Sequence, residues 1–445
     1  MDNRIDTLKG IKFFIHTFGC QMNENDSERI AGLLAAAGAR KSDSAEDSGV
    51  IIINTCAVRA KSEEKLYSYL GRLLPLKKTN GAVIGVAGCI GQLYRTELLA
   101  KKPFLDFICG PDHYQELPEI LSRCLREKVV STSWSRRWKE TPPRSILHES
   151  PVSAYVTIME GCDHFCAYCI VPFTRGREKF RPFRNIMAEI QDLAGRGYKE
   201  IQLLGQNVNS YRDPETGLAF SGLLREIDGT EGIEWIRFIT SHPRNFTPDI
   251  GEAMERSKKV CRQLHLPLQS GASSVLDRMS RGYTRQDYLD KVRHLRRLMP
   301  EISLSTDIIV GFPGETEKEF EETLTALQEI RFANIFSFRY SPRPRTTASR
   351  IKDDVPLEVK KRRLLEVQAL QKRIQSEIHK GDVGQILKVL CVGKSKKDGL
   401  AYSGRNEGYQ VVNFTSNQDL IGRFVHVLVT SWGPYSLRGE SQGPA

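Results

Sequence analysis

The chain of 445 residues is 40% hydrophobic and 27% charged, as in ordinary soluble globular proteins, and its length suggests about three domains. Its mean hydropathy is −0.37, and no apolar run approaches the roughly 18 residues of a membrane span. This composition argues against a membrane protein, a disordered chain and a secreted disulfide scaffold. The formal net charge of +11 suits a polyanionic partner such as RNA, with a solvated basic surface as the alternative.

The first ten residues, MDNRIDTLKG, lack the apolar core of a signal peptide and the composition of a transit peptide. We therefore expect a cytoplasmic protein whose cysteines stay reduced, because disulfides belong mainly to small secreted domains. The ten cysteines are Cys20, Cys56, Cys89, Cys109, Cys124, Cys162, Cys166, Cys169, Cys261 and Cys391.

Residues 11–127 alternate apolar strand-like runs with helical patterns, which predicts a doubly wound parallel α/β domain. The predicted strands cover 12–16, 50–53, 82–87 and 104–108, with helices near 23–38, 60–74, 91–101 and 114–126. Cys20, Cys56 and Cys89 each follow one of the first three strands, so we expect them to meet at one sheet edge, where open parallel sheets bind ligands. Cys109 also ends a strand, and the sequence alone does not exclude it from that edge. Three buried, inert cysteines are the alternative.

Residues 128–150 lack clear periodicity and contain two consecutive prolines, which predicts a linker. We expect Trp134 and Trp138 to pin this linker to a neighbouring domain, the alternative being that they stack on nucleic-acid bases. After residue 380 the pattern changes to short β-like pieces at 386–392, 409–414 and 424–430, with Leu437 near the end of the chain. Residues 381–445 therefore predict a small β-barrel, either an RNA-binding module or a structural cap.

Residues 151–380 contain six strand and helix units, which predicts a partial (β/α)6 barrel. The predicted strands cover 154–159, 200–204, 234–239, 263–267, 302–310 and 334–340, and the helices lie near 183–196, 219–228, 246–257, 271–298, 315–330 and 356–380. In such barrels the carboxyl ends of the strands carry the chemistry. Here each strand is followed by an unusual polar, cysteine or glycine cluster: 162–169, Gly205-Gln-Asn, Ser241-His-Pro, Gln269-Ser-Gly, Gly311-Phe-Pro-Gly and Ser341-Pro. Six clusters at matching ends predict a site.

The first of these clusters is Cys162-Asp-His-Phe-Cys166-Ala-Tyr-Cys169. A CxxxCxxC run in a reducing compartment predicts a metal or iron–sulfur site. A structural zinc ion and a fully protein-bound [4Fe–4S] cluster both take four protein ligands. Three thiolates therefore leave one iron open for a substrate or cofactor.

This loop, at the end of the first barrel strand, resembles the radical S-adenosylmethionine superfamily. Longer strings resemble one family within it, the methylthiotransferases: Thr17-Phe-Gly-Cys-Gln-Met-Asn23, Asn54-Thr-Cys-Ala-Val-Arg59, Gly85-Val-Ala-Gly-Cys89, Pro172-Phe-Thr-Arg-Gly-Arg-Glu178, Leu204-Gly-Gln-Asn-Val-Asn209, His265-Leu-Pro-Leu-Gln-Ser-Gly271 and Asp307-Ile-Ile-Val-Gly-Phe-Pro-Gly-Glu-Thr316. The resemblance runs from about residue 11 to the C-terminus, and GCQMN at 19–23 is similar to the MiaB type, which acts on isopentenyladenosine in tRNA. The family tends to read SPRPGTPAA where this chain reads SPRPRTTAS at 341–349, a departure that we expect to reshape a substrate-side loop.

The resemblance implies two [4Fe–4S] clusters. Cys162, Cys166 and Cys169 would hold one, whose open iron chelates S-adenosylmethionine, and Cys20, Cys56 and Cys89 would hold a second that carries sulfur. Two S-adenosylmethionine molecules would serve each turnover, one to methylate the sulfur and one to supply the 5′-deoxyadenosyl radical. The implied product is tRNA carrying 2-methylthio-N6-isopentenyladenosine at position 37, beside the anticodon. The other cysteines match no ligand position of the family and are expected to be structural: Cys109, Cys124, Cys261 and Cys391.

The strand ends supply the expected S-adenosylmethionine contacts, for which turns or caps are the alternative: Gln206, Asn207, Ser241, Gln269 and Asp307. Arginines near the barrel mouth are the expected tRNA phosphate contacts, with a solvated basic face as the alternative: Arg175, Arg177, Arg339, Arg343, Arg345 and Arg350. The expected partners are a tRNA anticodon stem-loop, whose single-stranded adenine can be splayed into a pocket, and an electron donor such as flavodoxin or ferredoxin. We expect a monomer and no membrane association.

Two other functions compete with this one. A radical enzyme of the same family could act on threonylcarbamoyl-adenosine in tRNA or on a ribosomal protein, although the GCQMN string and the basic charge weigh against the latter. A non-catalytic iron–sulfur protein that binds RNA is the other, although structural metal sites are normally closed. Mass spectrometry of tRNA and ribosomes would show which substrate is modified. Release of 5′-deoxyadenosine would distinguish an enzyme from a non-catalytic protein.

Overall fold

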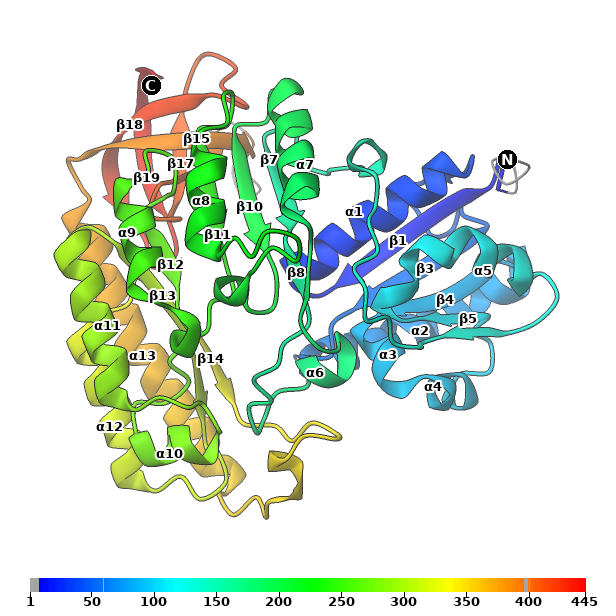
Figure 1. The fold of residues 1–445 in the computed structure, drawn as a ribbon, viewed down its shortest axis with the longest axis horizontal. Helices are drawn as coiled ribbons and strands as arrows, with labels where there is room; N and C mark the ends of the chain where they lie inside the picture. Colours follow the sequence, from blue (N-terminus) through cyan, green and yellow to red (C-terminus); the bar gives the residue numbers. More distant parts are fainter. Residues whose placement is uncertain (1–7, 59, 396–398, 400) are drawn as a thin grey trace.

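The computed structural model describes residues 8–58, 60–395, 399 and 401–445, and Figure 1 shows three folded units in chain order. An α/β unit in blue and cyan is followed by a larger α/β unit in green and yellow and by a β-barrel in orange and red. In the described part of the chain, no helix is both long and apolar enough to cross a membrane.

The N-terminal unit is a parallel sheet with the strand order β2-β1-β3-β4-β5-β6. Its strands are β1 (Lys12–Phe18), β2 (Arg40–Lys41), β3 (Val50–Thr55), β4 (Val83–Gly88), β5 (Phe107–Cys109) and β6 (Val129–Ser131). The four predicted strands are present, whereas β2 and β6 have two and three residues, too few to show a hydrophobic period. Since β6 belongs to the sheet, the prediction of an irregular linker is wrong for its first residues.

Helices cover both faces of this sheet, as a doubly wound fold requires. One face packs against α1 (Gln21–Ala36) and α5 (Leu117–Cys124), the latter preceded by the 3-10 helix η1 (Pro111–Glu116). The other face packs against α2 (Ala60–Asn80), α3 (Cys89–Tyr94) and α4 (Thr96–Lys101). The chain moves from β1 to β2 on one side and then to β3 on the other. The strand order therefore reverses between β1 and β3, which is the ligand-binding edge of open α/β sheets.

The segment after β6 lies directly against α1. A Cβ atom on Gly32 of α1 would sit 1.3 Å from the carbonyl oxygen of Ser145, within η2 (Pro143–Ser145), so only glycine allows this approach. The guanidinium of Arg29 lies 5.9 Å above the ring of Trp138. Trp138 thus pins the segment to α1, as expected.

Six parallel strands form the central unit in two ladders, β11-β10-β7 and β12-β13-β14. Their bounds are β7 (Ser153–Thr157), β10 (Glu200–Leu204), β11 (Trp235–Phe238), β12 (Gln263–His265), β13 (Ser303–Val310) and β14 (Asn334–Arg339). A parallel bridge joins Ile236 of β11 to Val260, just before β12, so the two ladders are neighbours and form the predicted partial barrel of six strands. The short pair β8 (Met159–Glu160) and β9 (Lys179–Phe180) brackets the cysteine loop.

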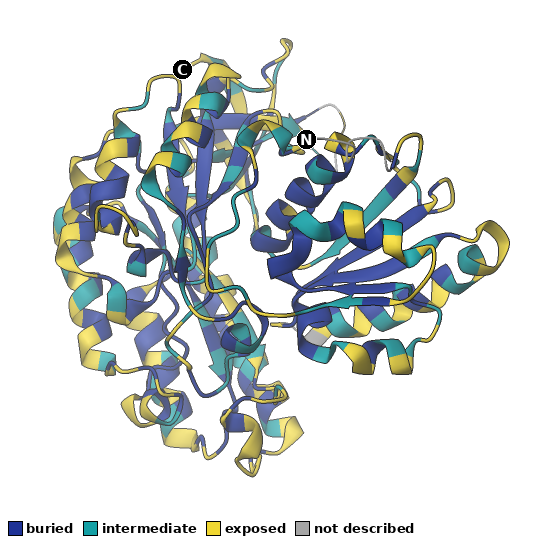
Figure 2. Cartoon of the chain, turned by 45° about the vertical axis from the view of Figure 1, so that its right-hand side comes forward, coloured by how far each residue is buried: buried dark blue, intermediate teal, exposed yellow. Residues whose placement is uncertain are grey.

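The barrel helices are α6 (Val171–Thr174), α7 (Phe183–Gly195), α8 (Phe220–Asp228), α9 (Pro248–Arg256), α10 (Ser273–Arg278), α11 (Arg285–Leu298), α12 (Glu317–Ile330) and α13 (Leu357–Gly381), with 3-10 turns η3 (Val208–Ser210), η4 (Pro243–Asn245) and η5 (Ala348–Arg350). Figure 2 shows buried residues along the strands and exposed residues on the outer faces of the helices. The single helix predicted over 271–298 is two helices, because Ser280 and Gly282 adopt positive φ angles of 57° and 67° that a helix does not allow.

The C-terminal unit is a closed barrel in the order β15-β16-β17-β19-β18, which confirms the predicted small β-barrel. Its strands are β15 (Ile386–Lys394), β16 (Tyr402–Asn406), β17 (Val411–Thr415), β18 (Phe424–Trp432) and β19 (Leu437–Pro444). Strand β16 lies outside the predicted pieces, since Tyr402-Ser-Gly-Arg-Asn carries little apolar character.

This small barrel docks on the amino ends of the central strands. Arg237 of β11 is buried against Glu200 of β10 and donates hydrogen bonds to the carbonyl oxygens of Asn406 and Glu407, at 2.8 and 2.6 Å. Ser303, the first residue of β13, donates from its hydroxyl to the carbonyl oxygen of Gly408 in the β16–β17 turn. The C-terminal barrel therefore sits at the opposite end of the strands from the six predicted clusters.

Candidate functional site

Cys20, Cys56 and Cys89 meet at the carboxyl edge of the N-terminal sheet, at its reversal point. Cys20 begins α1 after β1, Cys56 follows β3, and Cys89 begins α3 after β4. A hydrogen bond between the thiols of Cys56 and Cys20 lowers the pKa of Cys20 to about 6, aided by backbone N–H groups of α1. The same contact and burial raise the pKa of Cys56. The topology thus joins cysteines that are 36 and 33 residues apart in the sequence.

Asparagines of the same motifs hold this edge in place. Asn54 donates to the carbonyl oxygen of Asn23 at 2.8 Å and to Ser27 Oγ at 2.9 Å. Asn23 in turn donates to Asn54 Oδ1 and accepts from the backbone N–H of Cys20. Both asparagines are fully buried, so this network fixes the loops of the first two cysteines relative to each other.

The second cysteine group lies in the loop after β7, between β8 and β9. Gly161 has a φ of 85°, and a Cβ atom there would lie 2.1 Å from the carbonyl oxygen of Arg177, so the turn into the loop requires glycine. The backbone N–H of Gly161 donates to Gln206 Oε1, and that of Cys162 donates to the carbonyl oxygen of Gly176. Burial raises the pKa of both Cys162 and Cys169 to about 12.

The segment that follows Cys169 connects the second cysteine group to the first. Ile170 is buried in the apolar core beneath β3 and β4 of the N-terminal unit. Arg175, just after α6, donates from Nε to Cys89 Sγ at 3.3 Å and from a terminal nitrogen to Asp26 Oδ2 at 2.5 Å. Six residues therefore connect a ligand candidate of one group to a contact of the other.

Arg175 was predicted to contact a tRNA phosphate, and its position contradicts that role. Only 3% of its side chain is exposed, and its partner Asp26 is fully buried. Sequence spacing cannot distinguish a buried arginine from an exposed one two residues away. Arg177, by contrast, is largely exposed, pairs with Asp163 at 3.4 Å and lies 4.4 Å from the ring of Phe165.

Two buried donors converge on Cys166, and neither was predicted. Arg281 donates from Nη1 to Cys166 Sγ at 3.3 Å, and His242 Nε2 lies 3.9 Å from the same sulfur. Since His242 Nδ1 accepts the backbone N–H of Arg244, the imidazole proton sits on Nε2, facing the sulfur. Burial and the charge of Arg281 lower the pKa of His242, which keeps the ring neutral. The position of His242, next to the predicted Ser241, was the available sequence signal.

Several predicted S-adenosylmethionine contacts carry buried polar atoms that have no hydrogen-bond partner among the described residues. They are Asn207 Oδ1, Ser241 Oγ and Gln269 Oε1, and each follows a barrel strand at its carboxyl end. Asn209 was not predicted as a contact, but its amide oxygen and nitrogen are also buried and lack hydrogen-bond partners among the described residues. Buried polar groups without partners are rare, so these atoms fit a polar ligand such as S-adenosylmethionine.

The remaining two predicted contacts already have protein partners. Gln206 accepts from Gly161 and so anchors the cysteine loop. Asp307 lies 3.4 Å from His265 Nε2, and His265 Nδ1 lies 3.0 Å from Ser305 Oγ. Phe336 stands opposite Asp307 in the β13–β14 ladder and packs against His265. These side chains form one polar and aromatic cluster across β12, β13 and β14.

The loop after β14 reaches from the barrel to the N-terminal unit. Arg343 donates to the carbonyl oxygen of Val58 at 2.9 Å and lies near Glu63, and Ala348 donates to the carbonyl oxygen of Ala167 in the cysteine loop. Arg343 is thus engaged within the protein. Three other predicted phosphate contacts are exposed, one at the end of β14 and two in this loop: Arg339, Arg345 and Arg350. Arg345 has a φ of 70°, in the region that favours glycine.

The other cysteines lie away from both groups or are enclosed. Cys109 is fully buried on β5, donates to the carbonyl oxygen of Gly110, and has a pKa raised by burial. Cys391 is buried in the core of the C-terminal barrel, Cys261 is buried where the central unit packs against that barrel, and Cys124 is half-buried near Asp106. In the described part of the chain, no three Cys, His, Asp or Glu side chains are grouped as ligands of a single metal ion. Ligands on separate corners of a cluster are spread more widely than those around one ion.

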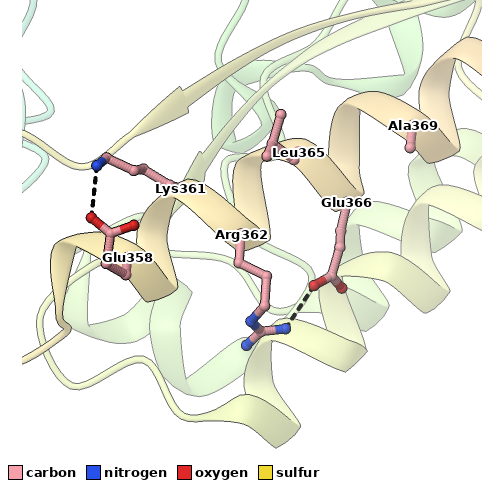
Figure 3. Close-up of a pocket in the computed structure, with 6 residues that line it drawn as sticks. All are labelled: Glu358, Lys361, Arg362, Leu365, Glu366 and Ala369. Atoms are coloured by element: carbon pink, nitrogen blue, oxygen red, sulfur yellow. Dashed lines mark hydrogen bonds and ion pairs between the residues drawn. The ribbon is translucent and has the colours of Figure 1, made fainter.

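A shallow hollow on α13 is unrelated to these groups (Figure 3). Its charged side chains pair along the helix, Lys361 with Glu358 and Arg362 with Glu366. No cysteine lines it, so it is a solvated helix face.

The chain matches three known families in sequence. Residues 12–110 match the family described as "Uncharacterized protein family UPF0004", residues 156–327 match the radical SAM superfamily, and residues 381–441 match the TRAM domain.

Three relatives that align over nearly the whole chain carry the name tRNA-2-methylthio-N(6)-dimethylallyladenosine synthase. The protein of Carboxydothermus hydrogenoformans is 44% identical over 433 residues, covering 96% of this chain and 98% of the relative. That of Geobacter metallireducens is 44% identical over 431 residues, covering 96% and 97%. That of Clostridium novyi is 42% identical over 445 residues, covering 99% and 98%.

Solved structures with a similar fold are radical S-adenosylmethionine enzymes. The cobalamin-dependent enzyme OxsB superposes with a TM-score of 0.52 at 12% identity, covering 81% of this chain and 56% of OxsB. The methyltransferase TsrM of Kitasatospora setae superposes with a TM-score of 0.52 at 13% identity, covering 76% and 77%. At these identities the likeness concerns the fold, and it supports the partial barrel described above.

Proposed function

Because the chain belongs to the family of tRNA-2-methylthio-N(6)-dimethylallyladenosine synthases, we propose that it methylthiolates C2 of N6-dimethylallyladenosine at position 37 of tRNA, beside the anticodon. It is a radical S-adenosylmethionine methylthiotransferase of the MiaB type. Its cofactors are [4Fe–4S] clusters and S-adenosylmethionine. When bound, these groups supply one-electron cleavage of S-adenosylmethionine and a carrier for the transferred sulfur.

We assign the cluster ligands to the two cysteine groups. Cys162, Cys166 and Cys169 would hold the cluster that faces S-adenosylmethionine, and Cys20, Cys56 and Cys89 would hold the auxiliary cluster. Soft thiolates are the usual ligands of such clusters, and each group provides three, which leaves one iron of each cluster open. The observation that carries the proposal is the contact of Arg175 with Cys89, because it supports a sulfur-carrying cluster beside the radical cluster.

The unpartnered atoms at the barrel strand ends would bind S-adenosylmethionine. Asn207, Ser241 and Gln269 offer an amide oxygen, a hydroxyl and an amide oxygen that lack partners in the described structure. Gln206 fixes the cysteine loop, and Asp307 projects from β13 next to His265. Burial of Asn207, Ser241 and Gln269 excludes water, which protects a radical from side reactions.

The tRNA would lie over the barrel mouth and be held through its phosphates. Arg177, Arg339, Arg345 and Arg350 are the phosphate contacts that we propose, since guanidinium groups clamp phosphate oxygens well. The domains that serve these roles are residues 11–127 for the auxiliary cluster, 128–150 as the connecting segment, 151–380 as the radical core and 381–445 as the TRAM-like RNA-binding barrel. We also propose that the protein is a monomer in the cytoplasm. A carrier such as flavodoxin or ferredoxin would supply its electrons.

Mass spectrometry of tRNA tests this function. The reconstituted protein is incubated anaerobically with S-adenosylmethionine, a reductant and tRNA that carries N6-dimethylallyladenosine. Digestion should release 2-methylthio-N6-dimethylallyladenosine, and matched tRNA without the dimethylallyl group should give none. Methylthiolation of threonylcarbamoyl-adenosine tRNA or of a ribosomal protein instead would reject the proposed substrate.

A further inference from the structure

Arg281 is a buried cation without a carboxylate partner. It lies in the break between α10 and α11, where only 4% of it is exposed. Its three nitrogens donate to Cys166 Sγ at 3.3 Å, the carbonyl oxygen of Pro267 at 3.0 Å and Tyr283 Oη at 3.0 Å. No acidic side chain of the described residues forms an ion pair with it. Because a buried unpaired charge is costly, the countercharge must come from what the site binds.

Arg175 presents the opposite case at the other cysteine group. It also donates to a ligand sulfur, Cys89 Sγ, at 3.3 Å. Its charge, however, is balanced by Asp26, which is fully buried and also accepts from the hydroxyl of Tyr114 at 3.2 Å. The two cysteine groups thus receive the same kind of hydrogen bond, but only one of them receives an unbalanced positive charge.

This difference acts on the reduction of a bound cluster. A [4Fe–4S] cluster on three thiolates becomes more negative by one charge when it accepts an electron. Net charge and hydrogen bonds to the sulfurs are among the factors that set its potential. A fixed cation at a ligand sulfur stabilises the reduced form more than the oxidised form. A buried Arg–Asp pair exerts a much smaller net field, since its two charges oppose each other.

We propose that Arg281 raises the reduction potential of the cluster on Cys162, Cys166 and Cys169, while Asp26 cancels the same effect of Arg175 on the auxiliary cluster. The inference rests on the proposed function, which supplies the two clusters. A low-potential one-electron carrier loses one electron, and the cluster beside Arg281 gains it; no proton moves. His242, the second donor to Cys166, adds to the effect. The electron therefore goes to the cluster that cleaves S-adenosylmethionine and not to the one that carries sulfur.

The first test isolates the cluster beside Arg281 in the full chain with Cys20, Cys56 and Cys89 replaced by Ala. Redox titration followed by electron paramagnetic resonance measures its potential, with Arg281→Gln and Arg281→Lys compared in that background. Arg281→Gln should lower the ratio of reduced to oxidised cluster at least tenfold at a fixed potential, equivalent to about 59 mV for one electron. Arg281→Lys, which keeps the charge, should stay within threefold. An unchanged ratio in Arg281→Gln, or an equal loss in both variants, would overturn the proposal.

The second test predicts a shift of opposite sign and does not depend on the folding of an Arg281 variant. In the full chain with Cys162, Cys166 and Cys169 replaced by Ala, Asp26→Asn leaves Arg175 without its countercharge. The ratio of reduced to oxidised auxiliary cluster should rise at least tenfold. The control is Asp192→Asn on α7, which removes the same charge from a carboxylate that pairs with Arg144 and Arg196. This control should leave the ratio unchanged. A lower or constant ratio in Asp26→Asn refutes the inference. Absence of clusters from the parent chain instead refutes the proposed function.

Discussion

Replacing Cys20, Cys56 and Cys89 together with Ala should remove one cluster and leave the other intact. Iron should fall from about eight to about four per chain, since each assigned cluster is of the [4Fe–4S] type. The cysteines that we assign to the other cluster, Cys162, Cys166 and Cys169, lie in the loop after β7 and are unchanged in this variant. The variant should therefore still release 5′-deoxyadenosine but should make no methylthiolated tRNA.

The structure also predicts that this variant stays folded. Cys56 and Cys89 are 3% and 4% exposed, whereas Cys20 is only partly buried. Loss of a buried group the size of a thiol costs about 1 kcal/mol, so the two buried sites cost about 2 kcal/mol together. The free energy of unfolding of a natural domain is about 5–15 kcal/mol, which exceeds this cost. The asparagine network of Asn23 and Asn54 does not use the thiols for its main bonds.

Iron and sulfide analysis, with chromatography of the nucleosides, measures both halves of the prediction. Cys109→Ala is the matched control, because Cys109 also ends a strand of the same sheet and is fully buried. This control should keep about eight irons and full methylthiolation. If Cys109→Ala loses a cluster while Cys89→Ala keeps both, the choice among the strand-end cysteines is wrong. If the triple variant still methylthiolates tRNA, the sulfur-carrier role fails.

Three further predictions concern single side chains. Cys162→Ala should abolish 5′-deoxyadenosine formation and reduce iron from about eight to about four per chain; undiminished cleavage of S-adenosylmethionine would reject the ligand assignment. Arg237→Met should leave Glu200 buried without its partner and cost about 3–5 kcal/mol, seen as easier thermal unfolding and proteolysis of the C-terminal barrel. The exposed pair of Arg144 gives the control, since Arg144→Met should cost less than about 1 kcal/mol. Arg345→Gly should relieve the strain of a φ of 70° by about 1 kcal/mol, yet reduce the salt slope of tRNA binding by about one; an unchanged slope would exclude Arg345 as a phosphate contact.

The sequence predicted the strands and the cysteine edge well, because both follow from local pattern and topology. Cys20, Cys56 and Cys89 each come within two residues of the end of a strand, and parallel strands bring such positions together. The edge strands β2 and β6 escaped prediction because two or three residues show no period. The break at Ser280 and Gly282 escaped it because the surrounding residues keep a helical pattern, while the backbone turns to hold Arg281 at Cys166.

Charge at the site could not be predicted from spacing. Arg175 and Arg177 are two residues apart and chemically identical, yet one is buried on Asp26 and the other is exposed. Which of them meets solvent depends on the packing of the cysteine loop against the N-terminal sheet, a long-range contact that leaves no local signal. Arg281 and His242 were missed for the same reason, since their role exists only once α10 and β11 lie beside the cysteine loop.

Burial at the barrel edge has one consequence for the protein without its cofactors. Asn207, Ser241 and Gln269 each bury a polar atom without a partner, and each such atom costs about 1–3 kcal/mol. The unbalanced buried charge of Arg281 also destabilises the protein without its cofactors. On the proposed assignment, a bound cluster and S-adenosylmethionine would supply partners for these groups, and any ligand that binds only the folded state stabilises it. The reconstituted protein with S-adenosylmethionine should therefore unfold at a clearly higher temperature than the apoprotein, and Cys162→Ala should lose most of that gain. Equal unfolding temperatures of apoprotein and loaded protein would mean that water already satisfies this edge, and that the unpartnered atoms do not mark the cofactor site.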